Sequence, residues 1–142
     1  MRAREPGVET PLIAPATAGA NLAALAHDHE FVFYESFLPD LAGHGRLGAE
    51  RATQASAGKE AIVTEQVHTA IALLDGLLGG LLVARRPGDT MLVTSDHGNI
   101  ESLAAPAHTR DPVPLLVVGP GAPAFADVED IAGVAGAILA AL

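Results

Sequence analysis

The sequence predicts an α/β protein with a layered, mostly parallel sheet and flanking helices. Segments with a helical period alternate along the chain with short runs rich in aromatic and β-branched residues, a pattern typical of such folds. The length of 142 residues suits one domain. A composition of 49% hydrophobic and 18% charged residues can form a buried core.

The first third of the chain divides into an arm, a helix and a strand. Residues 1–16 contain three prolines and no hydrophobic period, which predicts an irregular arm. Residues 17–28 carry apolar side chains at helical spacing, with Asn21 as a candidate cap. Residues 30–35 are dense in aromatic and β-branched types and predict a buried strand. The domain itself is expected over residues 17–142.

The remaining elements follow in the order helix, strand, strand, helix. Residues 47–57 are Ala-rich and polar, and are expected to form a helix or a surface excursion. Residues 60–86 repeat apolar side chains every three or four positions, which predicts a long amphipathic helix. Residues 90–94 and 113–118 predict two strands, and residues 127–142 predict a final helix with one apolar face.

Charge and composition exclude several classes of partner. The formal net charge of −9 and the eight Lys and Arg residues give no basic face for nucleic acid or anionic lipid. The chain has no cysteine, which excludes disulfides and zinc–thiolate sites. No run of 18 apolar residues indicates a membrane span, and no apolar stretch follows Arg2 and Arg4 as it would in a signal peptide. A cytoplasmic protein is therefore expected.

Three of the six histidines lie in loops next to predicted strands and close to carboxylates. Asp40 and His44 follow the first strand, Asp96 and His97 follow the second, and His108 precedes the third. If the first two strands are parallel neighbours, their loops open onto the same edge of the sheet, where these five side chains could converge. Carboxylate and imidazole without thiolate suit zinc, manganese or a similar divalent ion.

Each of these short motifs alone has a simpler explanation. An Asp and a His four residues apart in a loop usually form a polar turn, and Gly98 could supply a positive φ to another turn. His68 lies within the long predicted helix and is expected on its surface or in packing. His27 and His29 are expected in a polar turn between helix and strand. The occurrence of two such motifs, with a third histidine near another strand, favours metal binding.

Three segments together resemble one known family. Residues 94–101 (TSDHGNIE) and 108–114 (HTRDPVP) resemble the C-terminal metal-binding signature of the alkaline phosphatase superfamily. The likeness is greatest to the branch that holds cofactor-independent phosphoglycerate mutase and phosphopentomutase. Residues 39–44 (PDLAGH) resemble the other signature of that branch. The resemblance implies that the chain is a partial alkaline-phosphatase-like domain.

The resemblance also implies ligands and chemistry. Asp40, His44 and His108 would hold one metal ion, and Asp96 and His97 would contribute to a second. The complete enzymes of this family use two divalent ions, manganese or zinc, and this chain could hold one of them. They transfer phosphoryl groups through a covalent phospho-enzyme. Two ions stabilise the attacking and leaving oxygens of such a displacement together.

One departure from the family concerns the nucleophile. The resemblance places the nucleophilic Ser or Thr in an N-terminal part for which this sequence shows no counterpart. Ser36, Ser95 and Ser102 lie nearest the motifs but lack the nucleophile's context, so no residue is assigned as catalytic; Ser95 is expected to brace a turn. We expect a phosphomutase or phosphatase part that is inactive alone. The alternatives are a non-catalytic metal-binding module and an interaction domain with a degenerate site.

The expected partners are a phosphorylated small molecule and another polypeptide. Arg110 follows His108 closely and could bind a substrate phosphate, because guanidinium matches phosphate oxygens in pairs. It could equally be an exposed loop arginine. A sheet that lacks its neighbouring part would leave an edge strand and apolar surface uncovered. We therefore expect the chain to associate with itself or with the missing part as a separate chain, or to be marginally stable.

Overall fold

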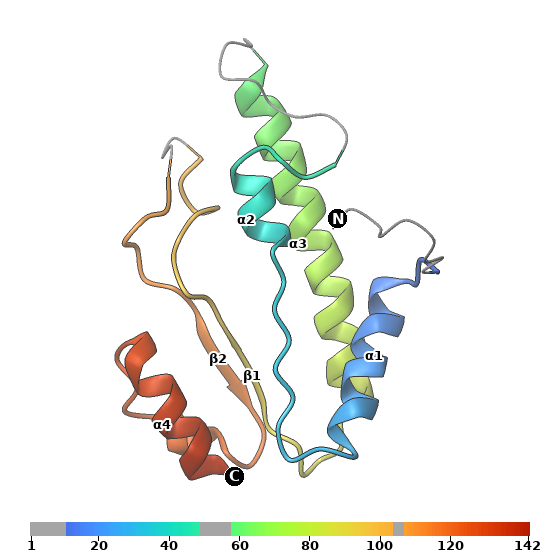
Figure 1. Ribbon diagram of the computed structural model, residues 1–142, viewed down its shortest axis with the longest axis vertical. Coiled ribbons are helices and arrows are strands. Elements are labelled where there is room, and N and C mark those ends of the chain that lie inside the picture. The colour runs from blue at the N-terminus through green and yellow to red at the C-terminus, as the bar shows by residue number, and fades with distance from the viewer. Residues whose placement is uncertain (1–10, 49–57, 104–106) are drawn as a thin grey trace, which may run out of the picture.

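The computed structural model of the chain describes residues 11–48, 58–103 and 107–142. These residues form a mixed arrangement of helices and a small sheet (Figure 1). The elements are α1 (Pro15–Ala26), α2 (Leu38–Gly43), α3 (Lys59–Ala84), β1 (Met91–Thr94), β2 (Leu115–Val118), the 3₁₀ helix η1 (Ala122–Phe125) and α4 (Ile131–Ala141). The α/β composition predicted from the sequence is confirmed.

The elements divide into two halves. In the helical half, α1 and α2 pack on the long helix α3, and in the sheet half, η1 packs with β2 and with α4. Figure 1 shows the two halves side by side, with α4 on the far side of the strands from α3. Among the described residues, no helix or strand of one half packs against one of the other half. The loops between elements therefore join the halves.

Helices α1 and α3 approach closely because glycines line their contact. A Cβ added at Gly19 would overlap the carbonyl oxygen of Leu77, and one added at Gly80 would overlap that of Ala16. Only a residue without a side chain allows backbones to come so near. At the lower end of this pair, the Arg86 guanidinium bonds both the Ala26 carbonyl oxygen (3.1 Å) and the carboxylate of Asp89. The hydrogen bonds from Arg86 hold the pKa of Asp89 below its usual value.

A small hydrophobic cluster fixes α2 on α3. Its buried members are Ala42 of α2 and Val63, Val67 and Ala70 of α3. Leu38, Leu47 and Ile100 pack against this cluster and are partly buried. Ile100 belongs to the loop after β1, so the cluster also anchors that loop to the helical half.

The sheet corrects the predicted topology. The two strands predicted over residues 90–94 and 113–118 form as β1 and β2, but they pair antiparallel, with Met91 opposite Val118 and Thr94 opposite Leu115. The described residues thus contain a two-stranded antiparallel sheet, and a layered, mostly parallel sheet is not confirmed. The physical reason is the connection: the described residues between β1 and β2 contain no helix, whereas parallel neighbours need a long crossover.

The strand predicted over residues 30–35 is wrong. This segment has no regular secondary structure, and the side chains of Phe31, Phe33 and Tyr34 are more than half exposed. Its aromatic and β-branched composition favours a strand, but a strand forms only when a neighbour satisfies its backbone groups. No described strand pairs with it.

The helices form where the sequence predicts them, but their ends differ from the predicted ones. Helix α1 begins at Pro15 with Ala14 as its N-cap, so Asn21 lies inside the helix and is not a cap. Of the arm predicted over residues 1–16, residues 1–10 lie outside the described residues, and the last two belong to α1. Asp130 caps α4, where its carboxylate accepts from the Gly133 N–H at 3.1 Å. The prediction for residues 47–57 falls almost wholly outside the described residues.

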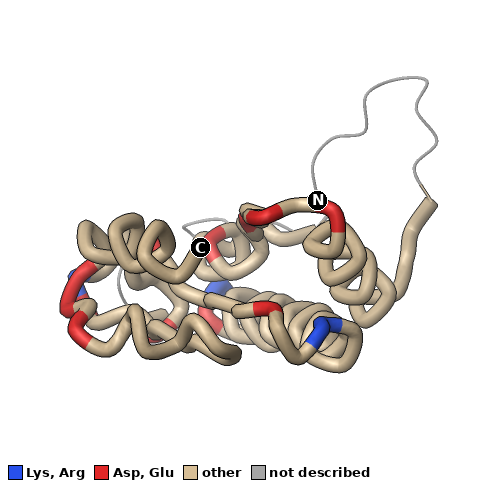
Figure 2. Tube along the Cα trace, turned by 90° about the horizontal axis from the view of Figure 1, so that it is seen from below, with Lys and Arg blue, Asp and Glu red and all other residues tan. Residues whose placement is uncertain are grey.

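Charge and hydropathy add two observations. Acidic residues outnumber basic ones along the described chain, and most of them lie in the segments between helices and strands (Figure 2). Helix α3 is, by length and composition alone, apolar enough to cross a membrane, although no single run of apolar residues indicated this. The core helix of a soluble protein can pass the same test, and α3 carries α1 and α2 on its surface.

Candidate metal centre

The antiparallel pairing brings both ends of the loop over residues 95–114 to the same end of the sheet. Gly98 and Thr109 continue the pairing as an isolated antiparallel bridge, in which the Thr109 N–H donates to the Gly98 carbonyl at 2.9 Å. The Ser95 hydroxyl donates to the carbonyl of His97 at 2.9 Å, so Ser95 braces this turn as expected. These bonds place His97 and His108, which adjoin the bridge, close together.

Helix α2 and the residue that caps its C-terminus supply the other two side chains. Asp40 and His44 are four residues apart, so they lie on the same face of one helical turn. The Oδ1 atom of Asp40 lies 3.3 Å from Nε2 of His44. Ala42, which lies between them in the sequence, is completely buried against α3. This contact fixes the orientation of α2, so that Asp40 and His44 face the loop after β1.

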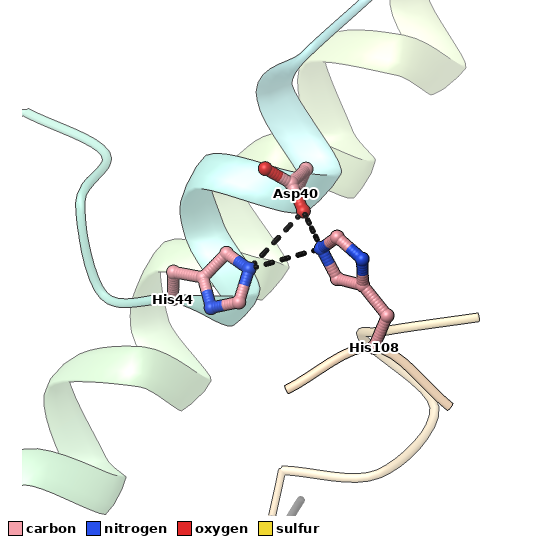
Figure 3. A group of neighbouring side chains, drawn as sticks. All are labelled: Asp40, His44 and His108. Atoms are coloured by element: carbon pink, nitrogen blue, oxygen red, sulfur yellow. Dashed lines mark hydrogen bonds and ion pairs between the residues drawn. The ribbon is translucent and has the colours of Figure 1, made fainter. Parts of the chain in front are cut away.

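Asp40, His44 and His108 converge on one point (Figure 3). Nε2 of His108 lies 3.1 Å from Oδ1 of Asp40 and 3.3 Å from Nε2 of His44. Among the described residues this is the group of His and acidic side chains whose geometry could hold a metal ion. The site lies at the surface: His108 is exposed, and Asp40 and His44 are partly buried.

The spacing of the three atoms fits a divalent ion. Ligand atoms about 2.0–2.2 Å from a zinc ion in tetrahedral geometry lie about 3.3–3.6 Å apart, and an octahedral arrangement brings them to about 3.0 Å. The observed separations of 3.1–3.3 Å fall at these values. Two imidazole nitrogens and one carboxylate oxygen are also donors that zinc and manganese accept. The residues present therefore fit the metal that their types predict.

The structure places Asp96 and His97 beside this group but not in it. The His97 ring stacks on the His108 ring, with centroids 3.6 Å apart and planes 11° apart. Its Nδ1 is buried and has no hydrogen-bond partner among the described residues. Oδ1 of Asp96 lies 3.5 Å from Nε2 of His97, and its side chain is 72% exposed. A role for these two residues in a second metal site stays a prediction.

Arg110 and three other histidines complete the sequence candidates. Arg110 is exposed two residues beyond His108, and its role in phosphate binding stays a prediction. His68 lies exposed on α3, as expected. His27 and His29 are exposed in the turn after α1 and lie outside the three-residue group.

Sequence reasoning missed how the loop is held together. Asn99 donates to Oδ1 of Asp40 at 2.8 Å, and Glu101 accepts from the Asn99 N–H at 2.6 Å and from the Thr109 hydroxyl. These hydrogen bonds, that from Thr109 first, hold the pKa of Glu101 below its usual value. Gly98 does not supply a positive φ, which among the described residues occurs at Gly45, Gly48 and Gly119.

The donor set and the mixed helix-and-sheet fold are those of a metal-binding α/β domain, and comparison with known families agrees. The family model described as the Metalloenzyme superfamily matches residues 16–142. The chain therefore belongs to this family. No solved structure shows a significant match to it.

Curated relatives confirm the branch that the motifs indicate. A phosphopentomutase of Methylobacterium sp. (strain 4-46) is 46% identical over 52 residues, which cover 37% of this chain and 13% of that protein. A 2,3-bisphosphoglycerate-independent phosphoglycerate mutase of Rhodopseudomonas palustris is 40% identical over 72 residues, covering 44% and 14%. Another such mutase, from Cereibacter sphaeroides, is 30% identical over 113 residues, covering 75% and 19%. The chain thus spans less than a fifth of the length of each of these relatives.

Proposed function

We propose that this chain supplies the divalent-metal-binding part of a phosphoryl-transfer enzyme of the phosphomutase or phosphatase type. The observation that carries the proposal is the convergence of Asp40, His44 and His108 at 3.1–3.3 Å. Membership of the Metalloenzyme superfamily and the likeness to two kinds of mutase support it. The proposal includes a partial alkaline-phosphatase-like domain and a cytoplasmic location.

The residues divide between metal and substrate. Asp40, His44 and His108 would hold one ion, manganese or zinc, and Asp96 with His97 would contribute to a second in the complete enzyme. When bound, such ions lower the barrier to phosphoryl transfer by stabilising charge on the transferred group and its neighbouring oxygens. Neutral imidazoles hold an ion without adding negative charge that would repel phosphate. Arg110, exposed near His108, would bind the substrate phosphate.

We further propose that these residues do not turn over a phosphate ester by themselves. Of the serines nearest the motifs in the sequence, Ser95 donates to the backbone of its own turn, and Ser36 accepts from the Leu38 N–H at the start of α2. Both hydroxyls thus have structural partners and neither has the setting of an activated nucleophile. A non-catalytic metal-binding module is the second candidate, and the complete three-residue group in this chain favours it.

Metal content and turnover test the proposal together. We expect the purified chain, reconstituted with manganese or zinc and then desalted, to retain about one ion per chain, and to hydrolyse p-nitrophenyl phosphate no faster than the metal alone. The metal is measured by mass spectrometry and the phenolate by absorbance. Absence of bound metal would refute both candidate functions. Turnover with a stable phospho-enzyme would refute the proposal that the nucleophile lies outside these residues.

A second prediction concerns partners. Phe31, Phe33 and Tyr34 are each more than half exposed, on a segment that pairs with no strand among the described residues. We expect the chain to self-associate through this segment, because adjacent exposed aromatic side chains and unpaired backbone favour contact with another chain. Sedimentation velocity should show a species larger than a monomer.

Two variants separate this segment from other apolar surface. Phe31→Ser with Phe33→Ser should shift the chain toward the monomer, whereas Val83→Ser, at a still more exposed position on α3, should not. A monodisperse wild-type monomer with a high melting temperature would count against the prediction.

A further inference from the structure

Asn99 belongs to the loop that carries His108, and its side chain contacts Asp40 of α2. Its amide nitrogen donates to Oδ1 of Asp40 at 2.8 Å. That same oxygen lies 3.1 Å from Nε2 of His108 and 3.3 Å from Nε2 of His44. The hydrogen bond therefore fixes the rotation of the carboxylate that directs Oδ1 at both imidazoles.

Helix α2 leaves space for this amide at one residue. A Cβ added at Gly43 would overlap Oδ1 of Asn99, and its next nearest neighbours would be the other atoms of the same amide group. Gly43 is in the helical region and needs no positive φ, so the close approach of Asn99 explains why a glycine suits this position.

The backbone around Asn99 is held from both halves of the molecule. On the sheet side, Glu101 accepts from the Asn99 N–H and from the Thr109 hydroxyl, and Thr109 bonds Gly98. On the helical side, Ile100 packs against the cluster that joins α2 to α3. Asn99 is thus presented to Asp40 by a loop with contacts on both sides.

We propose that Asn99 is a positioning residue that holds Asp40 in the orientation that a metal ion requires, with Gly43 providing the space for its amide. This inference rests on the proposed function, since it concerns the same site. Partners that orient a metal ligand typically change metal affinity by about 10–100-fold when they are removed. The site is then assembled before the ion arrives, and binding does not have to order the carboxylate.

Two substitutions test the proposal in different ways. Asn99→Leu keeps the shape of the side chain and removes its hydrogen-bond donor, whereas Gly43→Ala keeps the donor and displaces it. The control variant Asn21→Leu makes the same Asn-to-Leu substitution at an exposed position of α1, away from the site. Zinc affinity is measured by titration calorimetry. In the metal-free chain, the nuclear Overhauser contact between the His44 and His108 rings, whose centroids lie 5.4 Å apart, reports the assembly of the site.

We expect Asn99→Leu and Gly43→Ala each to weaken zinc binding by about 10–100-fold and to reduce the contact between the two rings, with Asn21→Leu like the wild type. Wild-type affinity and an intact ring contact in Asn99→Leu would overturn the proposal, as would a loss of affinity with the contact retained. A wild type that binds no metal, but whose ring contact depends on Asn99, would support the positioning role and refute the proposed function.

Discussion

Replacing either His44 or His108 by alanine is expected to weaken zinc or manganese binding by about 100-fold or more. This loss exceeds the one expected for Asn99→Leu, because Asn99 only orients a ligand. Each variant leaves two donors of the three that converge at 3.1–3.3 Å. Two donors hold a divalent ion too weakly to compete with water. Because His108 comes from the loop and His44 from α2, equal losses from both would show that the two segments share one ion.

Titration calorimetry at matched ionic strength measures the affinity of each variant. His68→Ala removes an exposed histidine of α3 that lies outside the group, and should bind like the wild type. A His108→Ala variant with unchanged affinity would show that the ion is held elsewhere.

The parts of the fold that the sequence predicted correctly are those determined by local pattern. The three- and four-residue apolar period gave the long helix within a few residues of its observed bounds, Lys59–Ala84, and the runs at β1 and β2 were strong enough to be found. The segment over residues 30–35 has an equally strong composition. It is not a strand because pairing depends on a neighbour, which composition does not show.

The convergence of three ligands was predicted through an argument about parallel strands that the structure does not support. Asp40 and His44 meet His108 because α2 packs on α3 and the hairpin-like pairing of β1 and β2 returns the loop to the same place. The residue types and their order therefore indicated three side chains that do converge, although the predicted topology was wrong. The bond from Asn99 to Asp40 joins positions 59 residues apart, and a single sequence carries no sign of it.

Adjacent glycines of α3 are expected to respond to the same substitution in opposite directions. A methyl group at Gly79 would meet no atom within 4 Å, whereas one at Gly80 would overlap the Ala16 carbonyl oxygen of α1. Gly79→Ala should therefore raise the free energy of unfolding by about 0.5–1 kcal/mol, because alanine loses less backbone freedom in a helix. Gly80→Ala also reduces the backbone freedom lost on folding, but its methyl group forces α1 away from α3. It should therefore lower the free energy of unfolding by about 1–3 kcal/mol.

Denaturant unfolding of the two variants, followed by circular dichroism, measures both changes under one set of conditions. Gly19→Ala approaches the same contact from α1, where its methyl group would overlap the carbonyl oxygen of Leu77. It should therefore behave like Gly80→Ala. Stabilisation of all three variants would mean that α1 does not lie against α3 at this distance. Since the buried hydrophobic side chains of the described helical half are otherwise those of alanine and valine, a loss of this contact would affect the whole half on which Asp40 and His44 depend.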